Sequence, residues 1–258
     1  MTAPVHIQLH REDDVEFVTL NRPDVRNAFN EQLIGELSAW ARAATADKSL
    51  RAVVISGAGP SFCAGADLVW MTKMASYTHE ENLRDARDAA DMFALLDSLP
   101  VPVIARVQGA ALGGGSGLVA IADIAVAESE AVFGLTEVKL GLIPSIIAPY
   151  VLAKVGQSAA RELFVTGRRF SAEHARHIGL VHDVVPRAEL DTAIGIYLKE
   201  LSTSGREAVS AAKQLLRTIA NRPVADVVPI TAEAIAARRT SPEAQALMRA
   251  FLDKKKRL

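Results

Sequence analysis

Hydrophobic positions in the first half of the chain alternate between strand-like runs and helix-like faces. Apolar or alternating runs typical of strands lie at 5–9, 15–20, 52–56, 101–107 and 124–127. The first two are separated by a charged turn and predict a hairpin. Asn30 can cap a helix whose apolar positions share one face, namely Leu33, Ile34, Leu37, Trp40, Ala41 and Ala44. A long amphipathic helix is predicted at about 78–96. This alternation favours parallel strand pairing with right-handed crossovers.

The pattern changes in the second half of the chain. After residue 145 the strand signals fade, and only the run 180–185 is strand-like. Helical patterns occupy 188–201, 207–220, 224–237 and 241–252. We therefore predict an α/β core over residues 1–190, followed by a helical region over residues 191–258.

Composition narrows the class of protein. Of the 258 residues, 50% are hydrophobic and 23% are charged, with a net charge of −1, which is too balanced to favour a nucleic-acid-binding surface. The chain has no apolar stretch near the ~18 residues of a membrane span, and its start lacks a secretory pattern. We expect a cytoplasmic protein with neither a nucleic acid nor a membrane as partner.

The single cysteine, Cys63, excludes a disulfide framework and is expected to be buried. The six histidines lack metal-binding spacing, so no metal site is expected.

The glycine-rich run 109–117 carries the strongest chemical signal. It lies between the strand-like run 101–107 and an apolar helix start at 118–122, so its backbone N–H groups can approach a negatively charged group closely. A second glycine-containing turn, 61–68, follows the run 52–56. Because the carboxyl ends of parallel strands share one edge of a sheet, one amide from each turn can meet a single oxygen. Such an oxyanion hole contributes ~3 kcal/mol per donor in a transition state. The run has neither P-loop nor dinucleotide-binding spacing.

Segments along nearly the whole chain resemble, in order, the crotonase superfamily of enoyl-CoA hydratases and isomerases. They are 21–30, 61–68, 109–115, 133–144 and 166–181. The segments 135–141, 144–150 and 179–186 are most similar to bacterial proteins assigned as methylglutaconyl-CoA hydratases. The resemblance implies a crotonase-like ββα spiral core with a C-terminal helical trimerisation region. It also implies an acyl-CoA thioester substrate, no separate cofactor because coenzyme A enters with the substrate, and a homotrimer or homohexamer.

The resemblance also implies roles for particular residues. The amides of Ala66 and Gly114 match the pair that holds the thioester oxygen and stabilises an enolate, and Glu137 matches a catalytic glutamate. The residues that would contact the substrate or its coenzyme A arm are Arg26, Ala28, Ala64, Asp67, Leu68, Gly113 and Gly117. Phe251 and Lys254, near the C-terminus, would either reach a neighbouring subunit's coenzyme A or belong to a solvated tail.

One position departs from the family pattern. Typical hydratases carry a first glutamate where this chain has Gly117, whereas hydration needs one group to activate water and one to protonate carbon. Either Glu137 does both, or another group assists, and Glu80, Glu81 and Asp85 are candidates on the helix that borders the acyl pocket. The apolar neighbours of Glu137 predict a raised pKa for its carboxyl group.

Three hypotheses follow. The first is a hydratase that adds water to a short or branched 2-enoyl-CoA, with 3-methylglutaconyl-CoA as a candidate substrate. The second is an enoyl-CoA isomerase that uses the single glutamate. The third is an acyl-CoA-binding protein with impaired catalysis. The acyl group depends on how the helix around Met71, Met74 and Tyr77 is arranged, and the sequence leaves this open, as it does the choice between trimer and hexamer.

Overall fold

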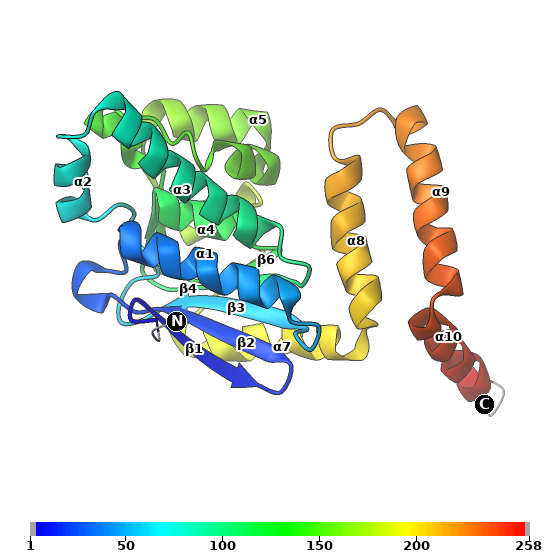
Figure 1. The fold of residues 1–258 in the computed structure, drawn as a ribbon. Helices are drawn as coiled ribbons and strands as arrows, with labels where there is room; N and C mark the ends of the chain where they lie inside the picture. Colours follow the sequence, from blue (N-terminus) through cyan, green and yellow to red (C-terminus); the bar gives the residue numbers. More distant parts are fainter. Residues whose placement is uncertain (1–3, 256–258) are drawn as a thin grey trace.

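A computed structural model describes residues 4–255 and shows a twisted main sheet covered by helices (Figure 1). The strand order in this sheet is β1-β2-β3-β4-β6-β9. Its strands are β1 Ile7–Glu12, β2 Val15–Leu20, β3 Ala52–Gly57, β4 Val103–Val107, β6 Ile124–Glu128 and β9 Asp183–Val185. The first two pair antiparallel as the predicted hairpin, and the other neighbours pair in parallel. The predicted parallel arrangement is thus confirmed.

A second, smaller sheet was not predicted. It has the strand order β5-β7-β8, with β5 Ala110–Leu112, β7 Val132–Gly134 and β8 Arg169–Ser171. Three residues carry too little alternation to be recognised as a strand, and β5 lies inside the glycine-rich run. These strands are defined by their partners rather than by their own sequence pattern.

Two helices on the core side, Glu31–Ala46 and His79–Asp97, follow the predicted helices closely. The longer helices of the core are α1 Glu31–Ala46, α3 His79–Asp97 and α5 Ala148–Thr166, and the shorter ones are α2 Leu68–Met74, α4 Gly114–Ile121 and α6 Ala172–His177. Asn30 caps α1 by accepting a hydrogen bond from the Leu33 amide at 2.9 Å, and the buried face of α1 is the predicted one. The sequence analysis missed α5, which contains a non-helical residue at Gly156.

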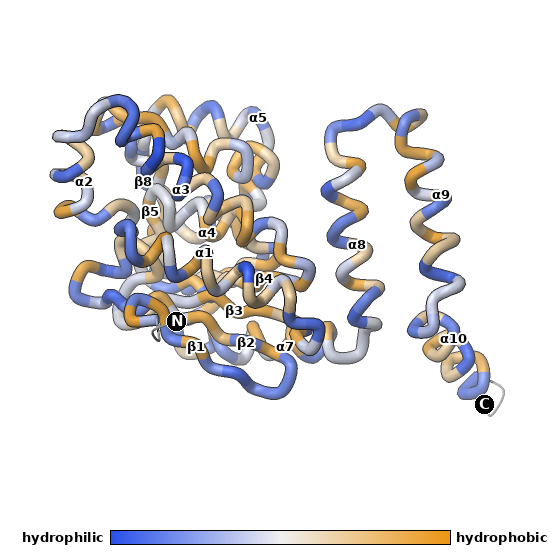
Figure 2. Tube along the Cα trace, viewed as in Figure 1, coloured by the Kyte–Doolittle hydropathy of each residue, from blue (hydrophilic) through white to orange (hydrophobic). Residues whose placement is uncertain are grey.

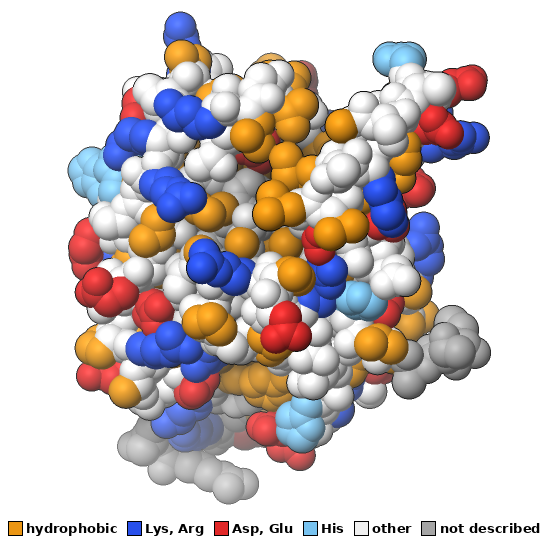
Figure 3. Space-filling view, turned by 90° about the vertical axis from the view of Figure 1, so that its left-hand side faces the viewer, with side chains coloured by type: hydrophobic (Ala, Val, Ile, Leu, Met, Phe, Trp, Pro, Cys, Tyr) orange, Lys and Arg blue, Asp and Glu red, His pale blue; other side chains and the backbone are white. Residues whose placement is uncertain are grey.

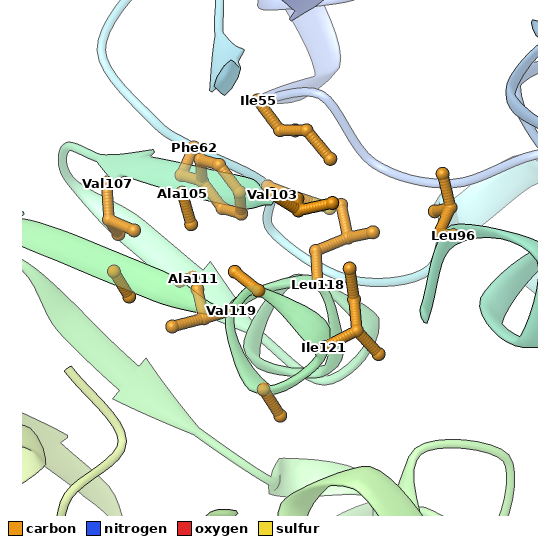
Figure 4. Close-up of a cluster of buried hydrophobic side chains, with 14 of the residues drawn as sticks. Ile55, Phe62, Leu96, Val103, Ala105, Val107, Ala111, Leu118, Val119 and Ile121 are labelled. Atoms are coloured by element: carbon orange, nitrogen blue, oxygen red, sulfur yellow. The ribbon is translucent and has the colours of Figure 1, made fainter. Parts of the chain in front are cut away.

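The predicted start of the helix after the glycine run was wrong by about one turn. We expected the helix at 118–122, but α4 already begins at Gly114. The glycines of α4 adopt helical geometry because the surrounding core packs tightly around them. Every residue from Gly115 to Ile121 is buried. Figure 4 shows Leu118, Val119 and Ile121 of α4 packed against Val103 and Ala105 of β4. This contact holds the second half of α4 beside the sheet.

The C-terminal helices divide into one that packs on the sheet and three that project from the core (Figure 1). On α7, Leu190–Thr203, the side chains of Leu190 and Ile194 are buried against Val54 and Ile104. In contrast, none of the described residues of α8 Arg206–Ile219, α9 Val224–Thr240 and α10 Pro242–Lys255 is buried. The predicted fold class, an α/β core followed by helices, is confirmed, whereas the boundary at residue 190 stays a prediction.

Short 3-10 helices complete the fold: η1 Pro23–Val25, η2 Thr136–Leu140 and η3 Arg187–Glu189. Between residues 4 and 255, no helix combines the length and the apolarity needed to cross a membrane.

Candidate active site

The two glycine-containing turns lie side by side because their backbones pair. The amide of Cys63 donates to the carbonyl of Ala110 at 2.9 Å, and the carbonyl of Cys63 accepts from the amide of Leu112 at 2.9 Å. The turn after β3 is therefore joined to β5, which lies directly after β4. As predicted, both turns follow the carboxyl ends of parallel strands, where ligands usually bind in such sheets.

Two glycines in the run allow this close approach. A Cβ atom on Gly109 would lie 2.1 Å from the carbonyl oxygen of Pro60, and one on Gly115 would lie 2.2 Å from that of Cys63. Gly109 also has a φ of +59°, which disfavours any side chain. Because the clashes are with backbone atoms, neither position can accept a larger residue without moving the paired turns apart.

The amides of Ala66 and Gly114 are both available to a ligand. Neither donates a hydrogen bond to another residue in the described part of the chain, and Gly114 is the first residue of α4, where intrahelical acceptors are missing. Their segments are adjacent, because a Cβ atom on Gly65 would lie 4.0 Å from the Cα atom of Gly113. The carbonyl of Gly65 accepts from the Phe29 amide at 2.7 Å, which fixes the segment before Ala66.

Glu137 lies beside these amides. It belongs to η2, and its Oε1 atom would be 2.9 Å from a Cβ atom on Gly113. Its Oε2 atom is buried and has no hydrogen-bond partner among the described residues. Burial raises the pKa of the Glu137 carboxyl above its usual value, which confirms the sequence-based prediction. An unpartnered carboxyl group with a raised pKa is suited to exchange a proton with a bound molecule.

Ala66, Gly114 and Glu137 line one cavity of about 340 Å³. Most of its wall is apolar and comes from α2, α3 and the segment before α5. The apolar lining residues include Phe29, Trp70, Met74, Ala89, Met92, Phe93, Ile143 and Ile147. Figure 3 looks at the side of the molecule that carries α2, where hydrophobic side chains gather in the upper half of the view. The cavity can therefore take an apolar chain while polar backbone groups hold one end of it.

The position of the missing glutamate is filled by apolar side chains. A Cβ atom on Gly117 would lie 2.3 Å from the Cγ2 atom of Ile147 and 3.0 Å from the Cε1 atom of Phe93. A carboxylate side chain at this position has no room in the present packing. Glu137 is thus the carboxyl group next to the two amides. Apolar side chains occupy the space where a second carboxyl group would lie.

The residues expected near the coenzyme A arm lie around the turn before α2. Arg26 is exposed, and its carbonyl accepts from the amide of Ala64 at 2.9 Å. Ala28 is buried, and Leu68 is 78% exposed at the start of α2. These placements are compatible with a ligand that crosses this surface, and the contact roles stay predictions.

Asp67 is engaged within the protein. One of its oxygens caps α2 by accepting from the Val69 amide at 2.7 Å, and the other pairs with Arg22 at 2.7 Å. These donors keep the pKa of Asp67 below its usual value despite the opposing effect of burial. The carboxylate therefore holds the turn that presents Ala66.

Several other predicted candidates lie away from the cavity. Glu81 forms a capping box with Thr78 at the start of α3, and neither Glu80 nor Glu81 lines the cavity, whereas Asp85 does. Phe251 and Lys254 are exposed on α10, far from α2 in the same chain (Figure 1).

Neither a thiol nucleophile nor a metal centre is supported. Cys63 is buried as predicted, and desolvation raises the pKa of its thiol to about 12. The described residues contain no group of histidine, cysteine and acidic side chains arranged to hold a metal ion.

The sequence analysis missed part of the cavity wall. Trp70 comes three residues after the helix cap Asp67 and turns inward, and Asn82 lies one turn before Asp85 on α3. The spacing of Asn82, Asp85, Ala89 and Phe93 follows one helix face and was the available signal.

Comparisons with known proteins show which family the chain resembles. Residues 10–257 match the family model described as enoyl-CoA hydratase/isomerase. The chain is 32% identical over 253 residues to the short-chain-enoyl-CoA hydratase of Clostridium acetobutylicum, which covers 97% of this chain and 96% of that protein. It is 37% identical over 211 residues to the 2,3-dehydroadipyl-CoA hydratase of Escherichia coli, covering 80% of each. The crystal structure of an enoyl-CoA hydratase from Shewanella pealeana has a TM-score of 0.94 and 36% identity, covering 97% of this chain and 94% of that one.

Proposed function

The chain belongs to the enoyl-CoA hydratase/isomerase family, and on that premise we propose that it is a hydratase that adds water to a short or branched 2-enoyl-CoA. The observation that supports this most is the cavity that Ala66, Gly114 and Glu137 share. It places two free amides and one unpartnered carboxyl group at the polar end of an apolar pocket. Coenzyme A enters as part of the substrate, and the proposal includes no separate cofactor.

In the proposed mechanism the thioester oxygen accepts hydrogen bonds from the amides of Ala66 and Gly114. As a nucleophile adds to the β carbon, negative charge moves onto this oxygen, and each amide stabilises the resulting enolate by ~3 kcal/mol. The ionised Glu137 takes a proton from water while the water oxygen bonds to the β carbon. The Glu137 carboxylic acid then returns that proton to the α carbon, so one water is added in total.

The single carboxyl group gives Glu137 both proton-transfer steps in this proposal. Ile147 and Phe93 fill the space beside Gly117, so an acid cannot act from there in this packing. The raised pKa of Glu137 suits a group that must first accept a proton and then donate it.

A second candidate function is an enoyl-CoA isomerase. The apolar wall of Ile147 and Phe93 favours it, because moving a double bond needs one carboxyl group that carries a proton between two carbons and needs no bound water. The same two amides would hold the same enolate.

The decisive assay uses the purified protein with crotonyl-CoA and with a 3-enoyl-CoA. A hydratase removes the conjugated enoyl-thioester absorbance of crotonyl-CoA, whereas an isomerase creates this absorbance from the 3-enoyl substrate. Turnover of crotonyl-CoA is the expected result. Coenzyme A thioester binding without turnover of either substrate would contradict the proposal and support a catalytically impaired binding protein.

The acyl group is best explored with crotonyl-CoA, 3-methylcrotonyl-CoA and 3-methylglutaconyl-CoA. The last was suggested by sequence resemblance and carries a terminal carboxylate. None of the described residues that line the cavity is a lysine, arginine or histidine. This lining favours the neutral chains over 3-methylglutaconyl-CoA.

We also propose that the protein assembles as a homotrimer, or as a hexamer of two trimers. The projecting helices α8, α9 and α10 have exposed hydrophobic side chains at Leu216, Val224, Val228, Ile235, Leu247, Met248, Phe251 and Leu252. Figure 2 shows hydrophobic segments along α8, α9 and α10, which stand away from the core. Neighbouring copies of the chain would cover them.

A further inference from the structure

The acyl cavity has a second polar region that the proposed chemistry does not use. Asp85 lines the cavity from α3, and its Oδ1 atom accepts a hydrogen bond from Nε1 of Trp70 at 3.1 Å. Trp70 is only 7% exposed, so the carboxylate is held by a well-packed ring. The other oxygen of Asp85 accepts no hydrogen bond from the described residues. It is therefore free to meet the end of a bound chain.

A second acceptor lies one turn away. Asn82 also lines the cavity, and its side-chain nitrogen donates to the backbone carbonyls of Tyr77 and Thr78 at 3.2 and 3.3 Å. This arrangement leaves the amide oxygen of Asn82 without a hydrogen-bond donor among the residues that the structure describes. Asp85 and Asn82 thus present hydrogen-bond acceptors to the cavity.

Asp85 lines a different part of the cavity from the space beside Gly117. Phe93, which faces Gly117, follows Asp85 by eight residues on α3, or about 12 Å of helix rise. Asp85 instead lies on the side of the cavity formed by α2, where it contacts Trp70.

The charge of Asp85 is not balanced by a cation in the cavity. The cavity lining contains no cationic side chain among the described residues, and the nearby Lys73 pairs with Glu31 at 3.1 Å. Arg84 and Arg87 lie one residue before and two residues after Asp85 on α3, where helix geometry directs them to other faces. Burial and the charges of Glu31 and Asp88 raise the pKa of Asp85, and no cation lowers it.

We propose that Asp85 is a specificity-determining residue, which selects enoyl chains that are neutral or end in a hydroxyl group and rejects chains that end in a carboxylate. This rests on the proposed enoyl-CoA function. A terminal hydroxyl would donate to the free oxygen of Asp85 or to Asn82. A terminal carboxylate would meet a like charge with no counterion in the cavity.

The test compares three six-carbon substrates that differ only at the far end: 2-hexenoyl-CoA, 6-hydroxy-2-hexenoyl-CoA and 2,3-dehydroadipyl-CoA. We expect kcat/KM for the carboxylated substrate to be about 100-fold below that for hexenoyl-CoA, as like charges at close range dictate. The hydroxylated substrate should match or exceed hexenoyl-CoA.

Asp85→Asn removes the charge while keeping an oxygen that can accept from Trp70. In this variant the ratio of kcat/KM between the neutral and carboxylated substrates should shrink about ten-fold or more. Asp91→Asn is the matched control, because it removes the same charge from an exposed position of α3 whose charge is not among those that act on Asp85. It should leave the ratio unchanged.

The binding of saturated thioesters gives a readout that needs neither turnover nor a variant. Calorimetry on the wild-type protein should show hexanoyl-CoA binding much more tightly than adipyl-CoA. Equal affinities, or an Asp85→Asn ratio no different from that of Asp91→Asn, would overturn the role of Asp85. Absence of turnover with every enoyl substrate, together with a preserved binding preference, would instead refute the hydratase activity alone.

Discussion

At the scale of single residues, the site depends on polar groups that form no hydrogen bond with other described residues. The amides of Ala66 and Gly114 donate to no described residue, and Oε2 of Glu137 is buried without a partner. Buried polar groups without partners are costly to a folded protein, which is why most are paired. Their presence together at one end of a cavity indicates that a ligand completes their hydrogen bonds.

The first prediction concerns Glu137→Gln, which keeps the shape of the side chain but removes its proton-transfer ability. Turnover of crotonyl-CoA should fall by about 10²–10⁴-fold, the usual contribution of a general acid–base group, while binding of the thioester persists. Stopped-flow absorbance and calorimetry measure the two effects separately. Full activity of this variant would show that another group is the base.

The raised pKa of Glu137 also predicts two pH dependences. Because the ionised carboxylate is the base, kcat/KM should fall as the pH drops through a midpoint above the ordinary value of 4.5. Because burial penalises the charged form, Glu137→Gln should raise Tm most at pH values above that midpoint, and the difference should shrink as the pH falls and vanish below the ordinary value of 4.5. A midpoint at or below the ordinary value would contradict the burial argument.

At the scale of elements, the packing of α4 decides which residues the site can carry. Its glycines lie against the backbone of the turn at Cys63 and against the side chains of Ile147 and Phe93. The helix therefore approaches its neighbours closely, and the resulting wall leaves one carboxyl group beside the two amides. The close packing of α4 as a whole explains why residue 117 is a glycine and not the glutamate of typical hydratases.

The same substitution in two helices should thus have opposite effects. Gly117→Ala in α4 puts a Cβ atom 2.3 Å from Ile147, and such overpacking destabilises by about 1–3 kcal/mol. Gly35→Ala in α1 meets nothing within 4 Å, and removing a helical glycine stabilises by about 0.5–1 kcal/mol. Urea unfolding of both variants checks the sign, and equal effects would show that the wall beside Gly117 yields easily.

At the scale of the whole molecule, α8 is oriented by ion pairs rather than by a hydrophobic contact with its own core. Lys213 pairs with Asp123 at 2.6 Å and Arg217 pairs with Asp97 at 2.6 Å. With its charged face turned to the core, the helix leaves Leu216, which is 67% exposed, on the open side. An amphipathic helix in this orientation is stable when another subunit covers its apolar stripe.

The oligomer prediction follows from this orientation. Light scattering on the purified protein should give the mass of a trimer or hexamer. Leu216→Glu should weaken assembly by about 10–100-fold in dissociation constant, since a buried leucine contributes about 1.5–3 kcal/mol. Thr218→Glu introduces the same charge at an exposed polar position of α8 and serves as the control. A wild-type monomer of undiminished stability would contradict the prediction.

The sequence by itself determined what depends on local pattern. The periodic burial of α1, its cap at Asn30, the hairpin and the parallel pairing of strands were all predicted, because side-chain spacing and cap chemistry act within a few residues. Motif resemblance similarly predicted the placement of Glu137 and of the two amides near one another, although their catalytic roles await the assays above.

Only the tertiary structure decided what depends on contacts between distant segments. The three-residue strands β5, β7 and β8 exist because of their partners, and α4 begins at Gly114 because the surrounding core holds its glycines in place. The occupied space beside Gly117 and the hydrogen bond between Trp70 and Asp85 join residues 30 and 15 positions apart. No local pattern encodes such distances, because they result from how complete elements pack against one another.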